Sequence, residues 1–507
     1  MKNQLRIGVY LSYINMAISC LIPFLYTPIM LDMLGQAEYG LYSLANSVVG
    51  YLSLLSFGFG STIIRYLSKY RAEKNQADLE KTYGFFLLLY TVLSVAILLG
   101  GLVIQQNIST IFDKGLLPDE VQKMKHLVMI MVLNLAMSFP LGVFSSVAIA
   151  HERYFFRKII DIISTIAAPV ANLVALYLGF ASVGMAWAGT IVQCILAPIS
   201  VFYCNSVLKI KPRFSKMPGK LIREMLGFSA FVFIATLVDM LFWATDKIIL
   251  GMLASSVAVA VYNVGGTFNT MVMSLSTSIS GVLVPRITGM VTTDSNRKNW
   301  TELFIRVGRI QFLIIALIVS GFSVFGQAFI HLWAGPEYAD AFWVAVLTMF
   351  PLCLPLIQNT GLSFAVAQNK HQFRSIVYLI IAVANVVATY LVVPYMGVIG
   401  AALCSCVSYL LGQGLIMNIY YYKVTGLDIP LFWKNILKMA IVPAVMLAVG
   451  MLLNHYITID NWFTFLAGVM LFTAVYAVLM YLFAMNDYER DIIRKPLQKI
   501  LRVLCKR

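Results

Sequence analysis

Two aspartates, Asp239 and Asp246, lie in one apolar stretch at 225–246. They are seven residues apart, so a helix places them on one face. An aspartate at the centre of a bilayer costs about 2.5–3.5 kcal/mol on insertion scales, and it therefore needs water, a partner or a proton. We take both as candidate sites for a coupling ion, a proton or sodium. The alternative for Asp246 is an interfacial charge pair with Lys247.

Hydroxyl and amide side chains follow one face of the next apolar stretch, 256–284. The steps between them are four, three, four and four, which keeps them in line on a helix. Such a stripe either bonds to a neighbouring helix or lines a wet cavity, and its length favours the cavity. The stripe consists of Asn263, Thr267, Thr270, Ser274 and Ser278, and a shorter one contains Ser12, Asn15 and Ser19.

Four arginines stand at the ends of apolar stretches, on the side that we assign to the cytoplasm below. One interpretation is anchoring, because basic residues favour that side of a membrane. The other is a basic ring that attracts a phosphorylated ligand, since the planar guanidinium matches phosphate geometry. The four are Arg65, Arg157, Arg286 and Arg374.

Paired prolines interrupt two apolar stretches. Pro23 and Pro28 lie in 8–30, and Pro351 and Pro355 lie in 340–367. Two prolines in one helix predict a bend or a break, which is either a static kink or a point that moves. The five histidines and seven cysteines show no ligand spacing, so we expect no metal site and no cofactor.

The elements that carry these residues must be membrane helices. Of the 507 residues 60% are hydrophobic and 12% charged, whereas a soluble domain has about 25% charged residues. The mean hydropathy is +0.84. This composition excludes a soluble enzyme, a disordered regulator and a disulfide-stapled secreted domain, and the continuous runs are unlike β-barrel strands. Fourteen runs are long enough to span: 8–30, 39–64, 83–105, 124–150, 156–179, 181–203, 225–246, 256–284, 303–326, 340–367, 373–394, 397–420, 437–457 and 462–484.

The basic residues give the orientation. With fourteen alternating spans, 33 of the 37 lysines and arginines fall on one side and 4 on the other. The side with the excess is cytoplasmic, so both termini are expected there. The net charge of +15 is therefore a collar facing anionic lipid, and no nucleic-acid partner is expected.

The chain also repeats itself. Residues 170–189 and 383–402 are identical at nine of twenty positions, and 145–159 matches 362–376, which aligns Arg157 with Arg374. The offset corresponds to six helices, an even number, so the repeats are parallel. We expect an all-α membrane protein with lobes at 1–210 (helices 1–6) and 211–424 (helices 7–12), followed by 425–507 with helices 13 and 14 and a basic tail.

Two segments carry a resemblance to a known family. Leu34-Gly35-Gln36-Ala37-Glu38-Tyr39-Gly40-Leu41-Tyr42, and Asp246-Lys247-Ile248-Ile249-Leu250-Gly251 followed by Tyr262-Asn263, are similar to signatures of the Wzx-type oligosaccharide flippases. These belong to the MOP superfamily, together with lipid II flippases and MATE drug exporters. The resemblance covers essentially the whole chain.

The resemblance implies a V-shaped, two-lobed transporter in the bacterial cytoplasmic membrane, with a central cavity. Its implied substrate is an undecaprenyl-pyrophosphate-linked oligosaccharide, moved to the outer leaflet for surface polysaccharide assembly. Implied partners are membrane lipids, a polysaccharide polymerase and assembly proteins. Lipid II flippases carry arginines within the first membrane helix; here Arg6 precedes that helix, which argues against lipid II itself. In those flippases, helices 13 and 14 form a groove for the lipid tail.

Two other functions stay open at this point. One is a MATE-like, cation-coupled exporter of organic cations or drugs, which needs an acidic, aromatic cavity. The other is a membrane glycosyltransferase or polymerase, which usually needs catalytic residues in sizeable outer loops. The outer loops here are short, and the polar cluster of His331, Glu337 and Asp340 surrounds a Gly-Pro turn.

Overall fold

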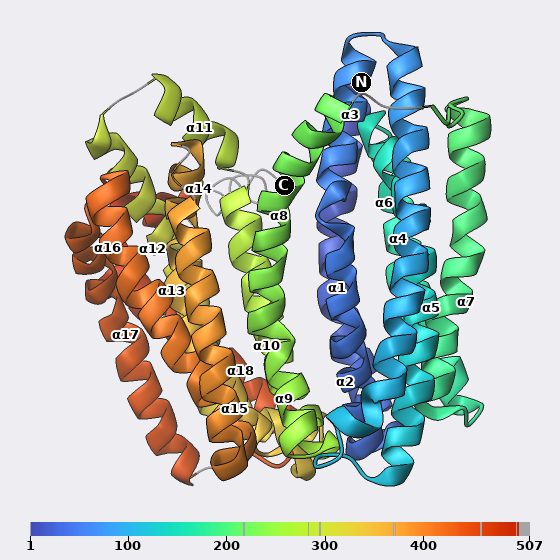
Figure 1. Cartoon of the computed structure of the whole chain (residues 1–507). Helices are drawn as coiled ribbons and strands as arrows, with labels where there is room; N and C mark the ends of the chain where they lie inside the picture. Colours follow the sequence, from blue (N-terminus) through green and yellow to red (C-terminus); the bar gives the residue numbers. More distant parts are fainter. Residues whose placement is uncertain are drawn as a thin grey trace, which may run out of the picture. The chain divides into compact units, whose positions relative to one another are not determined.

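The computed structural model describes residues 2–215, 219–281, 283–293, 296–368, 370, 372–456, 459–492 and 494–495. Within these ranges the regular structure is helical, without strands (Figure 1). The expected all-α membrane fold is confirmed. The chain divides into two compact units, Met1–Asn263 with Val386–Val398, and Val264–Asn385 with Ile399–Arg507. The lobe boundaries expected from the repeat stay a prediction.

The first unit is built from long helices joined by short turns. Side chains cap two helix starts: the Asp78 amide donates to Asn75 Oδ1 (3.1 Å), and the Leu117 amide donates to Glu120 Oε2 (2.9 Å). Its elements are α1 (Lys2–Leu34), α2 (Gln36–Leu52), η1 (Ser53–Ser56), α3 (Phe59–Ala72), α4 (Gln76–Ile111), α5 (Pro118–Ala150), α6 (Tyr154–Tyr177), α7 (Ala181–Phe202), η2 (Tyr203–Val207), α8 (Gly219–Trp243) and α9 (Thr245–Leu253).

The second unit contains the remaining helices. Its elements are α10 (Ser256–Gly281), α11 (Val284–Thr293), α12 (Arg297–Trp333), η3 (Pro336–Tyr338), α13 (Ala341–Ile357), α14 (Asn359–Ala367), α15 (Gln372–Tyr409), η4 (Leu410–Ile416), α16 (Met417–Tyr420), η5 (Tyr421–Thr425), α17 (Ile429–Tyr456), α18 (Trp462–Leu479) and η6 (Met480–Ala484). The start of α10, up to Asn263, and residues Val386–Val398 of α15 belong to the first unit.

The last two long helices pack onto α12. Val324 of α12 lies in a buried cluster with Met439 and Met446 of α17 and with Phe472 and Tyr476 of α18. These two helices, which stand outside the repeat, are thus attached to the second unit through one apolar core.

A buried ion pair closes the same region. Arg309 of α12 donates to both carboxylate oxygens of Glu489, at 2.5 and 2.8 Å, and to the backbone carbonyl of Ala484 at 2.9 Å. The two side chains are only 7% and 2% exposed. A bidentate pair with its other donors satisfied is stable in such a place, and removal of one partner leaves an uncompensated buried charge.

The number of spans is consistent with the fourteen expected. In the described residues, 11 helices are long and apolar enough to cross a membrane, or 13 if each bent pair is one span. One of them, Phe373–Thr425, has 53 residues, far more than the roughly 20 that a bilayer needs. Gly397 interrupts it with φ 54° and ψ −133°, as expected for two spans joined at a glycine.

Candidate functional site

A cavity with a mixed polar and apolar lining lies among three helices of the first unit. Its volume is about 360 Å³, within the range of about 300–1,000 Å³ that is usual for ligand sites. Each helix contributes one face, because the lining residues recur at steps of three and four. The polar lining residues are Asn134, Ser138 and Ser145 of α5, Arg157, Asp161 and Ser164 of α6, and Gln193 and Ser200 of α7.

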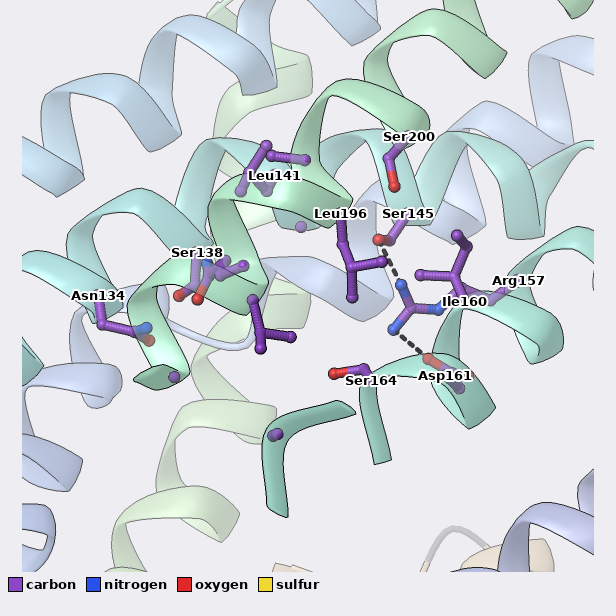
Figure 2. Close-up of a pocket in the computed structure, with 16 residues that line it drawn as sticks. Asn134, Ser138, Leu141, Ser145, Arg157, Ile160, Asp161, Ser164, Leu196 and Ser200 are labelled. Carbon is purple, nitrogen blue, oxygen red and sulfur yellow. Dashed lines mark hydrogen bonds and ion pairs between the residues drawn. The ribbon is translucent and has the colours of Figure 1, made fainter. Parts of the chain in front are cut away.

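Arg157 is the centre of this site. Figure 2 shows its guanidinium between Ser145 and Asp161. Nη1 donates to Ser145 Oγ at 2.6 Å, and Nη2 lies 2.8 Å from Asp161 Oδ1. The Arg157 side chain is 32% exposed and that of Asp161 23%, so the pair remains accessible from the cavity. The site therefore offers a neutralised cation together with several hydroxyls and amides.

Sequence reasoning found Arg157 but missed most of its surroundings. The missed residues include Asn134, Ser145, Asp161 and Gln193. A signal for them existed, because 134, 138, 142 and 145 form one polar or small face of α5, as 189, 193, 197 and 200 do on α7. The same pattern of small and polar residues occurs where two helices pack closely. The sequence therefore does not reveal the cavity, which forms only when the three helices come together.

The two signature segments meet in a second polar network. Lys247 Nζ donates to Asn263 Oδ1 at 2.6 Å, and Asn263 Nδ2 donates to the Tyr39 hydroxyl at 2.5 Å. Asp246, fully buried, accepts from the Tyr262 hydroxyl at 2.5 Å and from Thr389 Oγ1 at 3.3 Å. The first signature segment thus bonds directly to the second signature segment through Tyr39 and Asn263.

Two further residues of the first signature have structural roles. Glu38 accepts from Lys123 Nζ (2.9 Å) and from the Ser182 amide (3.0 Å), which ties α2 to the starts of α5 and α7. At Gly40 an added Cβ would lie 1.8 Å from the carbonyl oxygen of Ser256. Only glycine permits that approach between α2 and the start of α10.

Lys247 lies in α9, which has 9 residues and is too short to cross a membrane. Burial lowers its pKa to about 8, and the neighbouring Asp246 only partly opposes this shift. The Asn263 side chain therefore holds an ammonium group that loses its proton more readily than an exposed lysine.

The expectation that Asp239 and Asp246 share a helix face is wrong. The single helix expected at 225–246 ends at Trp243, and α9 begins at Thr245. The Tyr51 hydroxyl bonds to the Met240 carbonyl (3.2 Å) and to Thr245 Oγ1 at this break, and a side chain inserted at a helix turn is a known cause of interruption. Asp239 is exposed on α8, whereas Asp246 is buried.

The hydroxyl stripe of α10 lies on the less buried side of its helix. Thr270 is exposed, and Asn263, Thr267, Ser274 and Ser278 are half-buried. The opposite face buries Val264, Phe268, Val272, Ser276 and Ser280. The stripe is thus available to line a cavity, and that role stays a prediction.

The remaining basic candidates are not among the residues that line the cavity. Arg65 of α3 and Arg286 of α11 are both exposed. Arg374 of α15 lies over the ring of Tyr378, with 4.4 Å between the guanidinium carbon and the ring centroid. Asn15 of α1 accepts a long bond (3.4 Å) from Thr165 of α6.

The proline pairs differ in effect. α1 is one helix through Pro23 and Pro28, so no break occurs there, and a bend at these prolines stays a prediction. α13 ends at Ile357, two residues after Pro355, and α14 continues at an angle of 44°. Pro351 and Pro355 therefore lie directly before a bend, as expected from the loss of their backbone donors.

The fold defines a polytopic helical membrane protein. The structure is similar to "Lipid II flippase MurJ, inward closed conformation", with a TM-score of 0.76 and 15% identity over 96% of this chain and 99% of that one. It is also similar to an inward-facing multidrug resistance MATE family transporter of the MOP superfamily, with a TM-score of 0.62 and 14% identity over 83% and 99%.

A family model described as "Polysaccharide biosynthesis protein" matches residues 7–291, more than half of the chain. The chain belongs to this family, which confirms the resemblance found in the sequence.

Two curated relatives are similar over much of their length. EpsK of Bacillus subtilis, described as an uncharacterized membrane protein, is 20% identical over 485 residues, covering 93% of this chain and 94% of its own. MJ1068 of Methanocaldococcus jannaschii, described in the same words, is 20% identical over 381 residues, covering 72% and 74%.

Proposed function

We propose that this protein is a flippase, and that it moves an undecaprenyl-pyrophosphate-linked oligosaccharide from the inner to the outer leaflet of the bacterial cytoplasmic membrane. The family membership and the fold shared with a lipid II flippase support a transporter. The observation that supports a saccharide as the substrate is the cavity around Arg157, which offers hydroxyls, amides and a carboxylate. These are groups that hydrogen-bond to sugar hydroxyls.

The direction of transport is energetically favourable. A diphosphate with two negative charges gains about 4.6 kcal/mol per 100 mV when it leaves a negative interior. In this proposal the network of Tyr39, Asn263 and Lys247 fastens the outer side while substrate enters from the cytoplasm. Arg374, Arg65 and Arg286 attract the diphosphate, and the α10 stripe lines its route.

An inward proton or sodium ion adds to this driving force, with Asp239 as its site. Asp239→Asn then reduces transport at normal expression, because an amide cannot carry the proton or bind the cation as a carboxylate does. The measurement is export of lipid-linked saccharide with and without a proton or sodium gradient. Transport by the variant that responds to both gradients as the wild type does would remove Asp239 from the proposal.

The function is tested by deletion of the gene in the native host. The expected result is a complete lipid-linked repeat unit that accumulates on the inner leaflet and disappears when the wild-type gene is restored. Mass spectrometry of the accumulated lipid identifies the sugar. Normal surface polysaccharide without accumulation, in a strain with no second flippase gene, contradicts the proposal and directs the work to drug-efflux assays.

A further inference from the structure

We propose that the cavity of α5, α6 and α7 is a subsite for an uncharged, hydroxyl-rich sugar, that it excludes the diphosphate, and that Asp161 sets this preference. The inference rests on the proposed function, because that function supplies the saccharide. It reverses the simplest interpretation of Arg157, which is a phosphate ligand.

The charge of Arg157 is already matched. Asp161 Oδ1 lies 2.8 Å from Arg157 Nη2, one helical turn away on α6. These two are the charged residues among those that line the cavity. Lys158 lies 3.9 Å from Asp161 Oδ2 but does not line the cavity. A phosphate that approached Arg157 would have to displace the carboxylate or share the cation with it, and like charges at such distances repel.

The remaining groups favour a ligand that donates hydrogen bonds. An ionised carboxylate is purely an acceptor, and serine hydroxyls and side-chain amides both donate and accept. Asp161, Ser164, Gln193 and Ser200 therefore match sugar hydroxyls, which donate as well as accept. A diphosphate offers acceptors only and leaves the acceptor groups of the cavity without donors, which is costly in a partly desolvated site.

Small residues keep the cavity open. A Cβ added at Gly142 of α5 or at Gly189 of α7 would meet no atom within 4 Å, and both glycines line the cavity. A larger side chain at either position can therefore enter the cavity without a clash of its Cβ. Leucine also favours a helix more than glycine does, so Gly189→Leu is a blocking variant that we expect to fold.

The test uses the full-length protein in lipid nanodiscs free of sugar detergents. The probes are diacetylchitobiose, glucuronic acid and inorganic pyrophosphate, and binding is followed by saturation-transfer NMR and calorimetry. The wild type is expected to bind the neutral disaccharide at least tenfold more tightly than pyrophosphate. Asp161→Asn is expected to gain about tenfold for both anionic probes, and Gly189→Leu to lose the disaccharide.

A matched control removes a carboxylate elsewhere in the unit. Glu152 pairs with Arg71 at 3.4 Å and does not line the cavity, so Glu152→Gln leaves the order of the probes unchanged. The proposal is overturned if the wild type binds pyrophosphate as tightly as the disaccharide, or binds no disaccharide. It is also overturned if Asp161→Asn keeps the wild-type order. Should Asp161→Asn not be recovered folded, retained disaccharide binding by Gly189→Leu overturns it.

The binding test and the deletion experiment can fail separately, so failure of the subsite is distinguishable from failure of the proposed function. Inner-leaflet accumulation together with an unchanged probe order for Asp161→Asn leaves the flippase standing and removes the subsite. Disaccharide binding with a probe order that depends on Asp161, without accumulation in the deletion strain, keeps the sugar site and removes the flippase.

Discussion

Two arginine–carboxylate pairs, one in each unit, differ in almost every physical respect. Arg309 and Glu489 are 7% and 2% exposed and are joined by two bonds. Arg157 and Asp161 are 32% and 23% exposed, with one close contact of 2.8 Å beside a cavity. A sealed, fully satisfied pair fixes structure, whereas an open pair next to a cavity can exchange partners with a ligand.

The internal repeat gives a second contrast, because Arg374 is the counterpart of Arg157. Both repeats have a stacked aromatic pair next to the arginine. The ring centroids of Phe156 and Tyr203 are 3.6 Å apart, and those of Phe373 and Tyr420 are 4.6 Å apart. Four residues after each arginine, however, stands Asp161 in one repeat and Tyr378 in the other. The two repeats thus share the aromatic packing beside the arginine and differ in the charge of the residue one helical turn after it.

The largest effect is expected where the pair is sealed. Arg309→Met leaves Glu489 buried without its cation and should lower the free energy of unfolding by about 3–5 kcal/mol. Thermal and denaturant unfolding in detergent measures this. Arg306→Met on the same helix is the control, since its partner Glu302 is 68% exposed; with the contact to the Tyr488 ring it should cost about 1–2 kcal/mol, well below the loss for Arg309→Met. Equal losses of unfolding free energy for the two variants would show that burial does not make the Arg309–Glu489 pair more important for stability.

The open pair should show the opposite balance between stability and function. Arg157→Met should reduce transport of lipid-linked saccharide at least tenfold, because the guanidinium that orders Ser145 and Asp161 is lost. Its unfolding free energy should fall by about 1 kcal/mol, much less than for the sealed pair, because water still reaches both side chains of this partly exposed pair. Expression, stability and transport are measured on the same preparations. A stability loss as large as that of Arg309→Met would make Arg157 a structural residue.

The stacked aromatic pairs should behave alike in the two repeats. Phe156→Leu and Phe373→Leu each keep apolar volume but remove the ring stack, which is worth about 0.5–1.5 kcal/mol. Unfolding of both variants should shift by similar amounts within that range. A large shift in one repeat alone would show that the shared aromatic packing has diverged.

The signature network should show a dependence of stability on pH. The pKa of Lys247 is lowered to about 8 in the fold, below its ordinary 10.5, so the unfolded chain binds more protons between these values and stability rises with pH there. Relative to Lys247→Met, the wild type should therefore gain stability from pH 8 to 10. Parallel curves for the two proteins would show that Lys247 keeps an ordinary pKa.

The sequence predicted the helical fold, the repeat and the family, because hydropathy, basic residues and the signatures report on helices that a bilayer forces to form. It also identified Arg157. It missed the break at Ala244, since no proline or glycine lies between Asp239 and Asp246 and the interruption comes from Tyr51 on another helix. The cavity was not predicted either, because it also depends on contacts between helices. The polar faces of α5, α6 and α7 form a site only when the three helices pack together.

Flipping of the lipid-linked saccharide, and the part that Arg157 plays in it, can be measured in proteoliposomes. The lipid-linked saccharide extracted from the deletion strain is incorporated with purified wild-type protein or with Arg157→Met, and its sugar is oxidised from outside by a reagent that cannot cross the membrane. Wild-type vesicles are expected to expose nearly all of the saccharide, and variant and protein-free vesicles only about the outer half. An exposed fraction that is the same with and without wild-type protein would contradict flipping by this protein.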